Sequence, residues 1–382
     1  MIPYGRQDIT QADVDAVVEV LRSDFLTQGP LVPRFEKAVA DHIGVAHAVA
    51  VNSATSALHI ACLALGMGPG DWLWTTPITF VASSNCALYC GAQVDFVDID
   101  SRTYNMCPIA LRQKLEVARK AGRLPKVVVP VHLCGQPCDM EAIHALSQEY
   151  GFKVVEDASH AIGGKYRGTF IGDCRYSDIT IFSFHPVKIV TTAEGGMAVT
   201  KDADLVKRLD LFRSHGITRD PDMMTHEPDG GWYYQQIELG YNYRLTELQA
   251  ALGVSQLDRL DEYVARRHAL ARRYDVLLED LPLVTPWQHP DGYSGLHLYV
   301  VRVPAATHRQ VYDGLRARGI GVNLHYIPVH TQPYYRAMGF EPGNFPEAER
   351  YYAEAISLPM YAMLTEEDQD RVVAALSEAL TS

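Results

Sequence analysis

The 382-residue sequence predicts an α/β protein with a large, mostly parallel sheet between two layers of helices, followed by a smaller α+β region. From about residue 45 to residue 200, short apolar runs alternate with segments of helix length. Several of these runs are apolar at every position, which is typical of strands buried on both faces. Near residue 245 this alternation ends and a long helical stretch begins.

Seven apolar runs are the expected strands of the sheet. They cover residues 47–51, 71–76, 94–99, 126–131, 152–157, 178–184 and 196–200. Helix-length segments such as SATSALHIACLAL and MEAIHALSQEYG lie between most of them. An amphipathic segment, residues 11–23, precedes the strands and starts behind Thr10, a residue type that caps helix N-termini.

The second region is expected to form its own small domain. One long helix is expected from Thr246 to about Tyr274, and the domain boundary should lie inside it. Downstream come a strand-like run at 297–303, a helix at 307–318, a mixed segment at 319–330 and a final helix that starts at Thr365 with capping-box spacing. We therefore predict a large domain over residues 1–255 and a small one over residues 256–382.

Composition excludes several classes of protein. The chain has 34 Lys and Arg against 46 Asp and Glu, a net charge of −12, which argues against a general nucleic-acid binder. No apolar stretch is long enough to span a bilayer, so no membrane partner is expected. The N-terminus does not resemble a signal peptide, and seven irregularly spaced cysteines do not make a secreted disulfide framework. These features predict a cytoplasmic protein.

Two residues beyond expected strand ends carry possible chemistry. Asp157 ends the run FKVVED, at the strand edge where α/β proteins bind ligands, although an Asp there is also a common turn cap. Lys188 follows the next strand within SFHPVK. Such a lysine is usually solvated, but in a desolvated pocket it can form a Schiff base with a carbonyl. The glycines of the following TTAEGG would let the backbone pass close to a ligand.

A third element predicts a phosphate site. In VAVNSATSALHI a strand leads into a helix whose free N–H groups can hold an anion, with a hydroxyl from Thr55 or Ser56; an ordinary cap by Asn52 or Ser53 is the alternative. Phe80 follows another strand, where its ring could stack on a heterocycle or lie in the core. No dinucleotide or P-loop motif is present.

Taken together, these groups predict one cofactor. A phosphate cradle, a ring stacker, an acid for a ring nitrogen and an amine for a carbonyl are what pyridoxal 5′-phosphate requires. His132, Cys134 and Cys138 suggest a metal site less well, because H-x-C-x₃-C lacks a fourth ligand, and we expect buried thiols there and no metal.

The motifs resemble a known family over nearly the whole chain. The segments GYNYRLTELQAALG, FSFHPVK with TTAEGG, VVEDASHAIGG, VHLCGQPCDM and LGMGPGDWLWTTPITFVAS are similar to those of the DegT/DnrJ/EryC1/StrS nucleotide-sugar aminotransferases. The resemblance implies pyridoxal-phosphate enzymes of fold type I. Within this family, NSATSALH, SFHPVKIVTTAEGG and LFRSHGI look most like the pseudaminic acid biosynthesis branch.

The resemblance implies roles for particular residues. Lys188 matches the lysine that forms a Schiff base with the cofactor, Asp157 the carboxylate at the ring nitrogen, and His160 the residue beside the phenolic oxygen, where many relatives have Gln. The remaining cofactor contacts implied are Phe80 on the ring and, at the phosphate, Ala54, Thr55, Ser183 and Asn242 of a second subunit. The residues implied at the sugar-nucleotide site are Tyr4, Asp24, Phe25, Leu26, Thr27, Asn323, Leu324, His325 and Tyr326.

The implied activity is transamination in two halves by a homodimer with shared sites. Glutamate gives its amino group to the cofactor, and a UDP-linked 4-keto-6-deoxy-2-acetamido sugar then receives it, with Lys188 moving the proton. A sugar dehydratase of the same fold has His in place of Lys188, and a non-catalytic sensor would be expected to lose part of the site. A 4-amino-arabinose or bacillosamine type of aminotransferase remains an alternative, and a 3-amino-sugar or inosose type is less favoured.

Overall fold

The large sheet matches the seven strands expected from the sequence. The computed structural model describes residues 1–381 and, within them, shows a seven-stranded sheet in the order β1-β9-β8-β5-β4-β2-β3. Its strands are β1 (His47–Val51), β2 (Trp72–Thr75), β3 (Gln93–Phe96), β4 (Val127–Val129), β5 (Lys153–Asp157), β8 (Ile179–Ser183) and β9 (Gly196–Thr200). All neighbours pair in parallel except β9, which is antiparallel to both β1 and β8. The predicted fold class, a mostly parallel α/β sheet, is confirmed.

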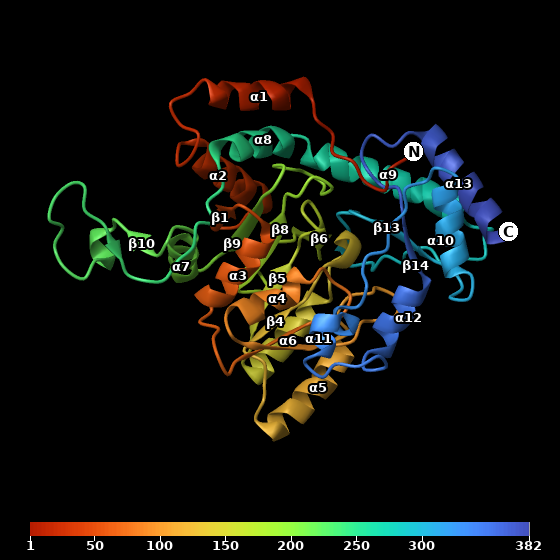
Figure 1. Ribbon diagram of the computed structural model, residues 1–382, viewed down its shortest axis with the longest axis horizontal. Helices are drawn as coiled ribbons and strands as arrows, with labels where there is room; N and C mark the ends of the chain where they lie inside the picture. The colour runs from red at the N-terminus through yellow and green to blue at the C-terminus, as the bar shows by residue number, and fades with distance from the viewer. Residues whose placement is uncertain (382) are drawn as a thin grey trace.

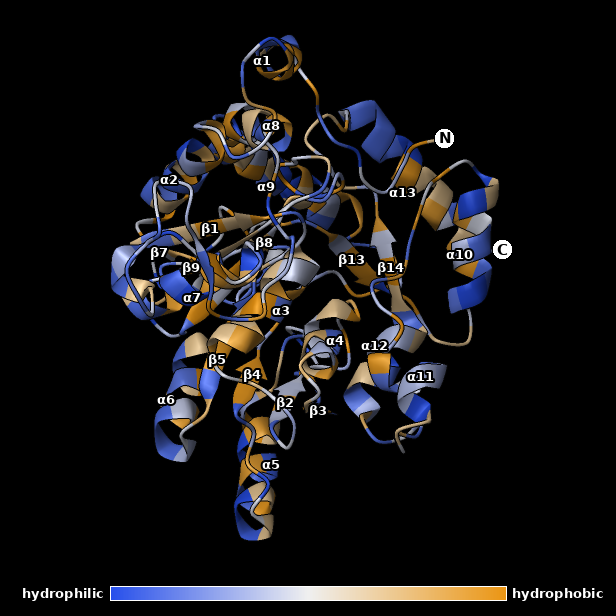
Figure 2. Cartoon of the chain, turned by 60° about the vertical axis from the view of Figure 1, so that its left-hand side comes forward, coloured by the Kyte–Doolittle hydropathy of each residue, from blue (hydrophilic) through white to orange (hydrophobic). Residues whose placement is uncertain are grey.

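Helices cover this sheet and account for its apolar strands. The helices of this part of the chain are α1 (Gln11–Leu21), α2 (Leu31–Ile43), α3 (Ala54–Ala64), α4 (Ala82–Tyr89), α5 (Pro108–Ala121), α6 (Met140–Tyr150), α7 (Ala203–Arg213) and α8 (Glu247–Leu257). Figure 1 shows them around the central strands. Figure 2 shows the apolar residues gathered in the sheet and on the helix faces turned toward it, as burial of both sheet faces requires.

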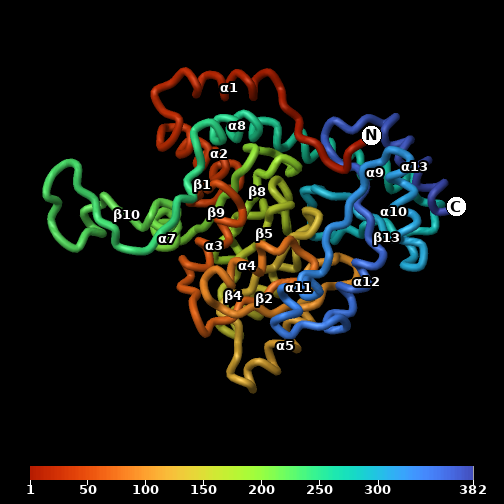
Figure 3. Tube along the Cα trace, in the orientation of Figure 1, coloured from red at the N-terminus to blue at the C-terminus, as the bar shows by residue number. Residues whose placement is uncertain are grey.

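The C-terminal part has a core of its own. It contains α9 (Leu260–Leu277), α10 (His308–Ala317), α11 (Pro333–Arg336), α12 (Pro346–Glu354), α13 (Glu366–Thr381) and the antiparallel pair β13 (Tyr299–Arg302) and β14 (Ala355–Leu358). One apolar cluster is built from α9, α10, α13, the two strands and Ile2, whereas Tyr335 of α11 and Ala348 and Tyr351 of α12 belong to a cluster of the large sheet. Both chain ends therefore lie on this side of the molecule (Figure 3). The exact division at residues 255 and 256 stays a prediction.

Shorter pieces complete the chain. Two small sheets are formed by β12 (Gly292–Tyr293) with β6 (Lys165–Tyr166) and β7 (Thr169–Phe170), and by β10 (Ile217–Thr218) with β11 (Gln235–Gln236). Residues 217–241 form an arm that extends away from the body beyond α7 (Figure 1). Its exposed side chains include Trp232, Tyr234 and Leu239. No helix within residues 1–381 is long and apolar enough to cross a membrane.

The single long helix expected over residues 246–274 is wrong. The chain forms α8 and α9 instead, and the break falls at Asp258 and Arg259. The Arg259 guanidinium donates to a carbonyl of the preceding turn and, through Nη2, to both carboxylate oxygens of Asp13 in α1, at 2.9 and 2.7 Å. A contact between residues distant in sequence accompanies this break, and helical periodicity carries no sign of it.

Replacing Asp13 by alanine should destabilise the protein. The Asp13 side chain is fully buried and also accepts hydrogen bonds from Ser255 and Gln256. Burial raises its pKa, but these partners and Arg259 outweigh that effect and lower it, so the stabilisation holds at neutral pH and fades in acid. Leaving Arg259 unpaired should cost about 3 kcal/mol in urea unfolding. The exposed Asp15→Ala on the same helix should cost less than about 0.5 kcal/mol, and an equal loss in both variants would contradict this account.

Candidate active site

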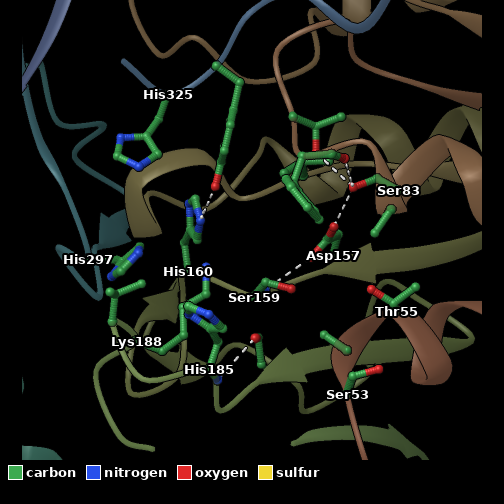
Figure 4. Close-up of a pocket in the computed structure, with 18 of the residues that line it drawn as sticks. Ser53, Thr55, Ser83, Asp157, Ser159, His160, His185, Lys188, His297 and His325 are labelled. Atoms are coloured by element: carbon green, nitrogen blue, oxygen red, sulfur yellow. Dashed lines mark hydrogen bonds between the residues drawn. The ribbon is translucent and has the colours of Figure 1, made fainter. Parts of the chain in front are cut away.

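A cavity of about 530 Å³ opens where several strands of the large sheet end. Asp157 and Ser183 close strands β5 and β8, and the first turn of α3 and the segment before α4 also line the cavity. Figure 4 shows Ser53, Thr55 and Ser83 on the side of Asp157, with His297 and His325 across from them. Residues from the C-terminal part complete the lining. This size suits a small-molecule ligand. The predicted residues that line it are Tyr4, Ala54, Thr55, Phe80, Asp157, His160, Ser183, Lys188, Asn323, Leu324, His325 and Tyr326.

The start of α3 lies at one end of the cavity, where a predicted phosphate site would be. Ser53 is the N-cap, and its Oγ accepts the Ser56 N–H at 3.1 Å, so the ordinary capping role and the open first turn coexist. Ala54 and Thr55 line the cavity, whereas the Ser56 hydroxyl is turned toward Asn52, 2.6 Å away. Thr55, rather than Ser56, is therefore the hydroxyl available to a bound phosphate.

The two glycines of TTAEGG do not face the ligand cavity. The neighbouring Glu194 lines the cavity, but the glycines make close contacts with the protein itself. A Cβ atom on Gly196 would lie 2.4 Å from the Ala54 nitrogen, and one on Gly195 would lie 2.1 Å from Thr192 Oγ1. The expected close approach to a ligand is therefore not found at these glycines, and the close neighbour of Gly196 is the start of α3. This glycine lets β9 lie against the phosphate-binding turn.

Hydrogen bonds hold both the backbone and the side chain of Asp157. Its backbone N–H donates to Pro130 O and its carbonyl accepts from the His132 N–H, which ties the end of β5 to the adjacent chain. Its Oδ2 accepts from Ser83 Oγ at 2.6 Å and its Oδ1 accepts the Ser159 N–H at 3.1 Å. The side chain is 5% exposed and faces the cavity. Such a fixed carboxylate can pair with a protonated ring nitrogen.

Lys188 brings a primary amine into the same cavity. Burial lowers the pKa of the Lys188 amine to about 8, although the nearby Asp157 acts in the opposite direction. A substantial fraction of this amine is therefore uncharged near neutral pH, as attack on a carbonyl requires. Lys188 lies beside His185 and within the same group of side chains as His160 and His297 (Figure 4).

His160 is a neutral imidazole with a defined tautomer. Its Nδ1 accepts the backbone N–H of Cys134 at 3.3 Å, so the proton lies on Nε2, which is 3.1 Å from the Tyr326 hydroxyl. Burial, and then the positive charge of Lys188, lower the pKa of His160 well below its ordinary value. His160 can therefore donate one hydrogen bond toward the cavity without carrying charge.

Two further histidines complete this wall, and one was not predicted. The His297 ring lies 4.5 Å from that of His160, its Nδ1 is buried without a hydrogen-bond partner, and burial lowers its pKa well below the ordinary value. Its run, HLYVVRV, carries no local signal of a site. His325 hydrogen-bonds Ser357 through Nδ1 at 2.8 Å, and burial lowers its pKa to about 3. These imidazoles are uncharged at neutral pH.

Phe80 stands at the open side of the cavity. Its ring is 58% exposed and its centroid is 6.2 Å from that of Tyr326. A large exposed ring beside a cavity favours stacking on a ligand over the alternative of a core aromatic. Other lining residues without a predicted role include Thr79, Ser83, Ser159 and Glu194.

Five predicted site residues lie outside the cavity of their own chain. The four residues 24–27 and Asn242 occupy neighbouring surface segments, since Thr27 pairs with Thr246 and Asn242 with Ser214. Phe25 and Leu26 are each about half exposed. A role at the site of a second copy is compatible with this position, and it stays a prediction.

The possible metal ligands near Cys134 are engaged otherwise. His132 Nε2 lies 2.7 Å from Glu156, and its Nδ1 accepts the Cys138 N–H. The Cys138 thiol is buried, as expected, whereas Cys134 is only partly buried.

The groups that line the cavity fit pyridoxal phosphate. The open helix turn suits its phosphate, Asp157 its ring nitrogen, the Lys188 amine its aldehyde, and the exposed Phe80 ring its face. The sequence predicted pyridoxal phosphate as the cofactor, and the side chains of the cavity agree with that prediction.

Comparison with known proteins gives the family directly. The model of the DegT/DnrJ/EryC1/StrS aminotransferase family matches residues 7–377. The chain is 39% identical to the spore coat polysaccharide biosynthesis protein SpsC of Bacillus subtilis, over 99% of this chain and 96% of that protein. It is similar in structure to Helicobacter pylori PseC, an aminotransferase involved in the biosynthesis of pseudoaminic acid (31% identity, TM-score 0.91, 100% and 99% coverage).

A third relative was solved with the cofactor. The putative sugar aminotransferase Spr1654 of Streptococcus pneumoniae, in its PLP form, matches at 29% identity with a TM-score of 0.89, covering 100% of this chain and 98% of that one. The cavity and these matches lead to one conclusion: the chain belongs to the DegT/DnrJ/EryC1/StrS family and is a sugar aminotransferase that depends on pyridoxal phosphate.

Proposed function

We propose that this enzyme transfers the amino group of glutamate to C4 of a UDP-linked 4-keto-6-deoxy-2-acetamido sugar, as in the pathway to pseudaminic acid. The observation that carries the proposal is His160. This neutral imidazole stands in the cavity, hydrogen-bonded to Tyr326, where many members of the family have glutamine. The full-length similarity to PseC supports the same assignment.

The side chains that line the cavity have separate roles in this reaction. Bound pyridoxal phosphate supplies a ring that withdraws electrons from the carbon losing its proton. Lys188, with its lowered pKa, takes and returns that proton. Asp157 holds the ring nitrogen in its charged form, and the neutral His160 orients the ring without adding positive charge.

The charge of the cavity supports a second copy of the chain as partner. Among the residues of the described chain that line the cavity, Lys188 is the one Lys or Arg, and the pKa values of His160, His297 and His325 are lowered. The diphosphate of a nucleotide sugar is strongly negative and needs donors or cations. We propose that a homodimer supplies them, with Asn242 and the segment Asp24–Thr27 reaching the site of the partner.

Two observations support that interface. The predicted partner residues share one surface, because Thr27 pairs with Thr246 beside Asn242. The arm over residues 217–241 is continuous with this surface and exposes Trp232, which is 75% accessible in the single chain. Large apolar side chains of this kind are enriched where protein surfaces meet.

A substrate panel tests the sugar. Purified enzyme with glutamate should convert the UDP-linked 4-keto-6-deoxy-2-acetamido sugar with a kcat/KM at least about tenfold above those for the 4-amino-arabinose and bacillosamine precursors. Mass spectrometry would identify the amino sugar, and formation of 2-oxoglutarate would identify the donor. Preference for another 4-keto sugar would overturn the substrate assignment but leave the enzyme class intact.

A mixing experiment tests the shared site. Lys188→Ala and Asn242→Asp should each give weak activity alone. If Asn242 serves the partner's site, equal mixing and reassortment should restore about a quarter of the wild-type activity, because half of the dimers are mixed and each has one intact site. If Asn242 serves its own chain, no mixed dimer has an intact site and activity stays low.

A further inference from the structure

Asp157 accepts a hydrogen bond from a buried pair of hydroxyl groups, those of Ser83 and Thr79. Ser83, the second residue of α4, donates from Oγ to Asp157 Oδ2 at 2.6 Å. Thr79 Oγ1 lies 2.7 Å from the same Ser83 oxygen. Ser83 is 0% and Thr79 2% exposed, so water does not compete for these bonds. Figure 4 shows the hydrogen bonds that join Ser83 to Asp157 and Asp157 to Ser159.

Proton counting gives this network a direction. The Ser83 hydroxyl has one proton, and its acceptors are the Asp157 carboxylate at 2.6 Å and the Phe80 carbonyl at 3.3 Å. The shorter, charge-assisted bond to Asp157 is the stronger one. Thr79 must then donate to Ser83 rather than accept from it. The order is Thr79 to Ser83 to Asp157.

Both oxygens of Asp157 are thereby fixed. Ser83 holds Oδ2, and the Ser159 N–H holds Oδ1 at 3.1 Å. Removing Ser83 would leave the Ser159 N–H as the remaining side-chain restraint in this pair, so that the carboxylate could turn more freely. A carboxylate that must meet one ring atom at a set angle gains affinity for its partner when it is held beforehand.

We propose that Ser83, supported by Thr79, is a positioning residue that holds Asp157 in the orientation needed to bind the ring nitrogen of pyridoxal phosphate. Ser83 acts through Asp157 and needs no contact with the cofactor. The proposal rests on the pairing of Asp157 with that nitrogen, and it does not depend on which sugar the enzyme uses.

The positioning role of Ser83 can be tested by comparing two cofactors, one with the ring nitrogen and one without it. Pyridoxal phosphate and its 1-deaza analogue, in which carbon replaces the ring nitrogen, are titrated into cofactor-free enzyme and the dissociation constants are measured by fluorescence quenching. Ser83→Ala should weaken binding of pyridoxal phosphate about tenfold and leave binding of the analogue unchanged within about twofold. Thr79→Val, which removes only the outer donor, should weaken the natural cofactor about threefold.

Ser84→Ala is the matched control. Ser84 is the next residue on α4 and is equally buried, but its hydroxyl bonds Tyr335 and Val81 O instead of Asp157. Both cofactor forms should bind it as they bind wild type. Ser83→Thr keeps a hydroxyl and should recover most of the lost affinity, and Thr79→Val still decides the question if the Ser83 variants fold poorly.

Different results would overturn the role of Ser83 and the pairing of Asp157 with the ring nitrogen. Equal weakening of both cofactor forms by Ser83→Ala would mean a direct contact or a general packing role, and no weakening would mean that Asp157 needs no support; either overturns the proposal. Asp157→Asn should itself discriminate between the two forms. If it does not, the pairing with the ring nitrogen is wrong, which separates that failure from a failure at Ser83.

Discussion

Lys188→Ala is expected to lower kcat by about 10⁴-fold or more and to remove the yellow absorbance band of the enzyme with its cofactor. The amine lies in the same cavity as Asp157, and its pKa of about 8 leaves it partly uncharged near neutral pH. An absorbance scan before and after glutamate is the direct measurement. Wild type should show the band and lose it on adding glutamate.

Two variants sharpen this test. Lys188→Arg keeps a positive charge but has no amine that can attack a carbonyl, and it should be as inactive as the alanine variant. Lys201→Ala removes an exposed lysine beyond the end of β9 and should behave as wild type. A yellow band that persists in Lys188→Ala and still responds to glutamate would mean that another group performs the chemistry.

The lowered pKa of Lys188 also predicts a pH dependence. Unfolded lysine keeps its proton to about 10.5, whereas the folded protein releases it near 8. Between these values the unfolded state binds more protons, so the stability of the cofactor-free protein should rise with pH through this window. In Lys188→Met this rise should be smaller by about 1–3 kcal/mol, and the variant should be the more stable protein at pH 7. Capture of pyridoxal phosphate by wild type should likewise speed up as the pH rises to about 8.

Asp157→Asn is expected to lower kcat by about 10²–10³-fold. The amide has nearly the same shape, but its single oxygen can replace only one of the two carboxylate oxygens that accept from Ser83 and from the Ser159 N–H. The variant also loses the negative charge that would hold a proton on the ring nitrogen. Single-turnover kinetics with glutamate alone measure this step without the sugar.

The control for Asp157 lies at the opposite end of the strands. Asp178 precedes β8, accepts the Val154 N–H and pairs with Lys153. Asp178→Asn makes the same chemical change far from the cavity and should leave kcat within about twofold of wild type. An equally active Asp157→Asn would show that the ring nitrogen needs no charged partner in this enzyme.

Local sequence patterns predicted the large sheet well. Each of the seven expected apolar runs overlaps an observed strand, and the observed ends differ by at most a few residues, as for β5 at Lys153–Asp157 against the expected 152–157. The caps at Thr10 and Thr365 are also where the sequence placed them. Strands buried on both faces and helix caps depend on residues that are close in the sequence, and for this reason the sequence could predict them.

The resemblance of motifs gave the family, the cofactor and most of the lining of the cavity. Lys188, Asp157 and His160 were named because they stand in recognisable segments, and all three line one cavity. His297 was missed because its run reads as an ordinary strand, and Ser83 because its partner Asp157 is 74 residues away. Sequence spacing holds no information on a contact made only when α4 packs beside the end of β5.

The sequence by itself determined the α/β class, the strands, the helix caps and the residue types able to hold pyridoxal phosphate, since each follows from local periodicity or from a contiguous motif. Only the tertiary structure decided that α8 and α9 separate where Arg259 meets Asp13, that Gly196 makes room for the start of α3, and that Ser83 fixes the carboxylate of Asp157. These three depend on long-range packing, in which burial and exact distance decide which side chains meet.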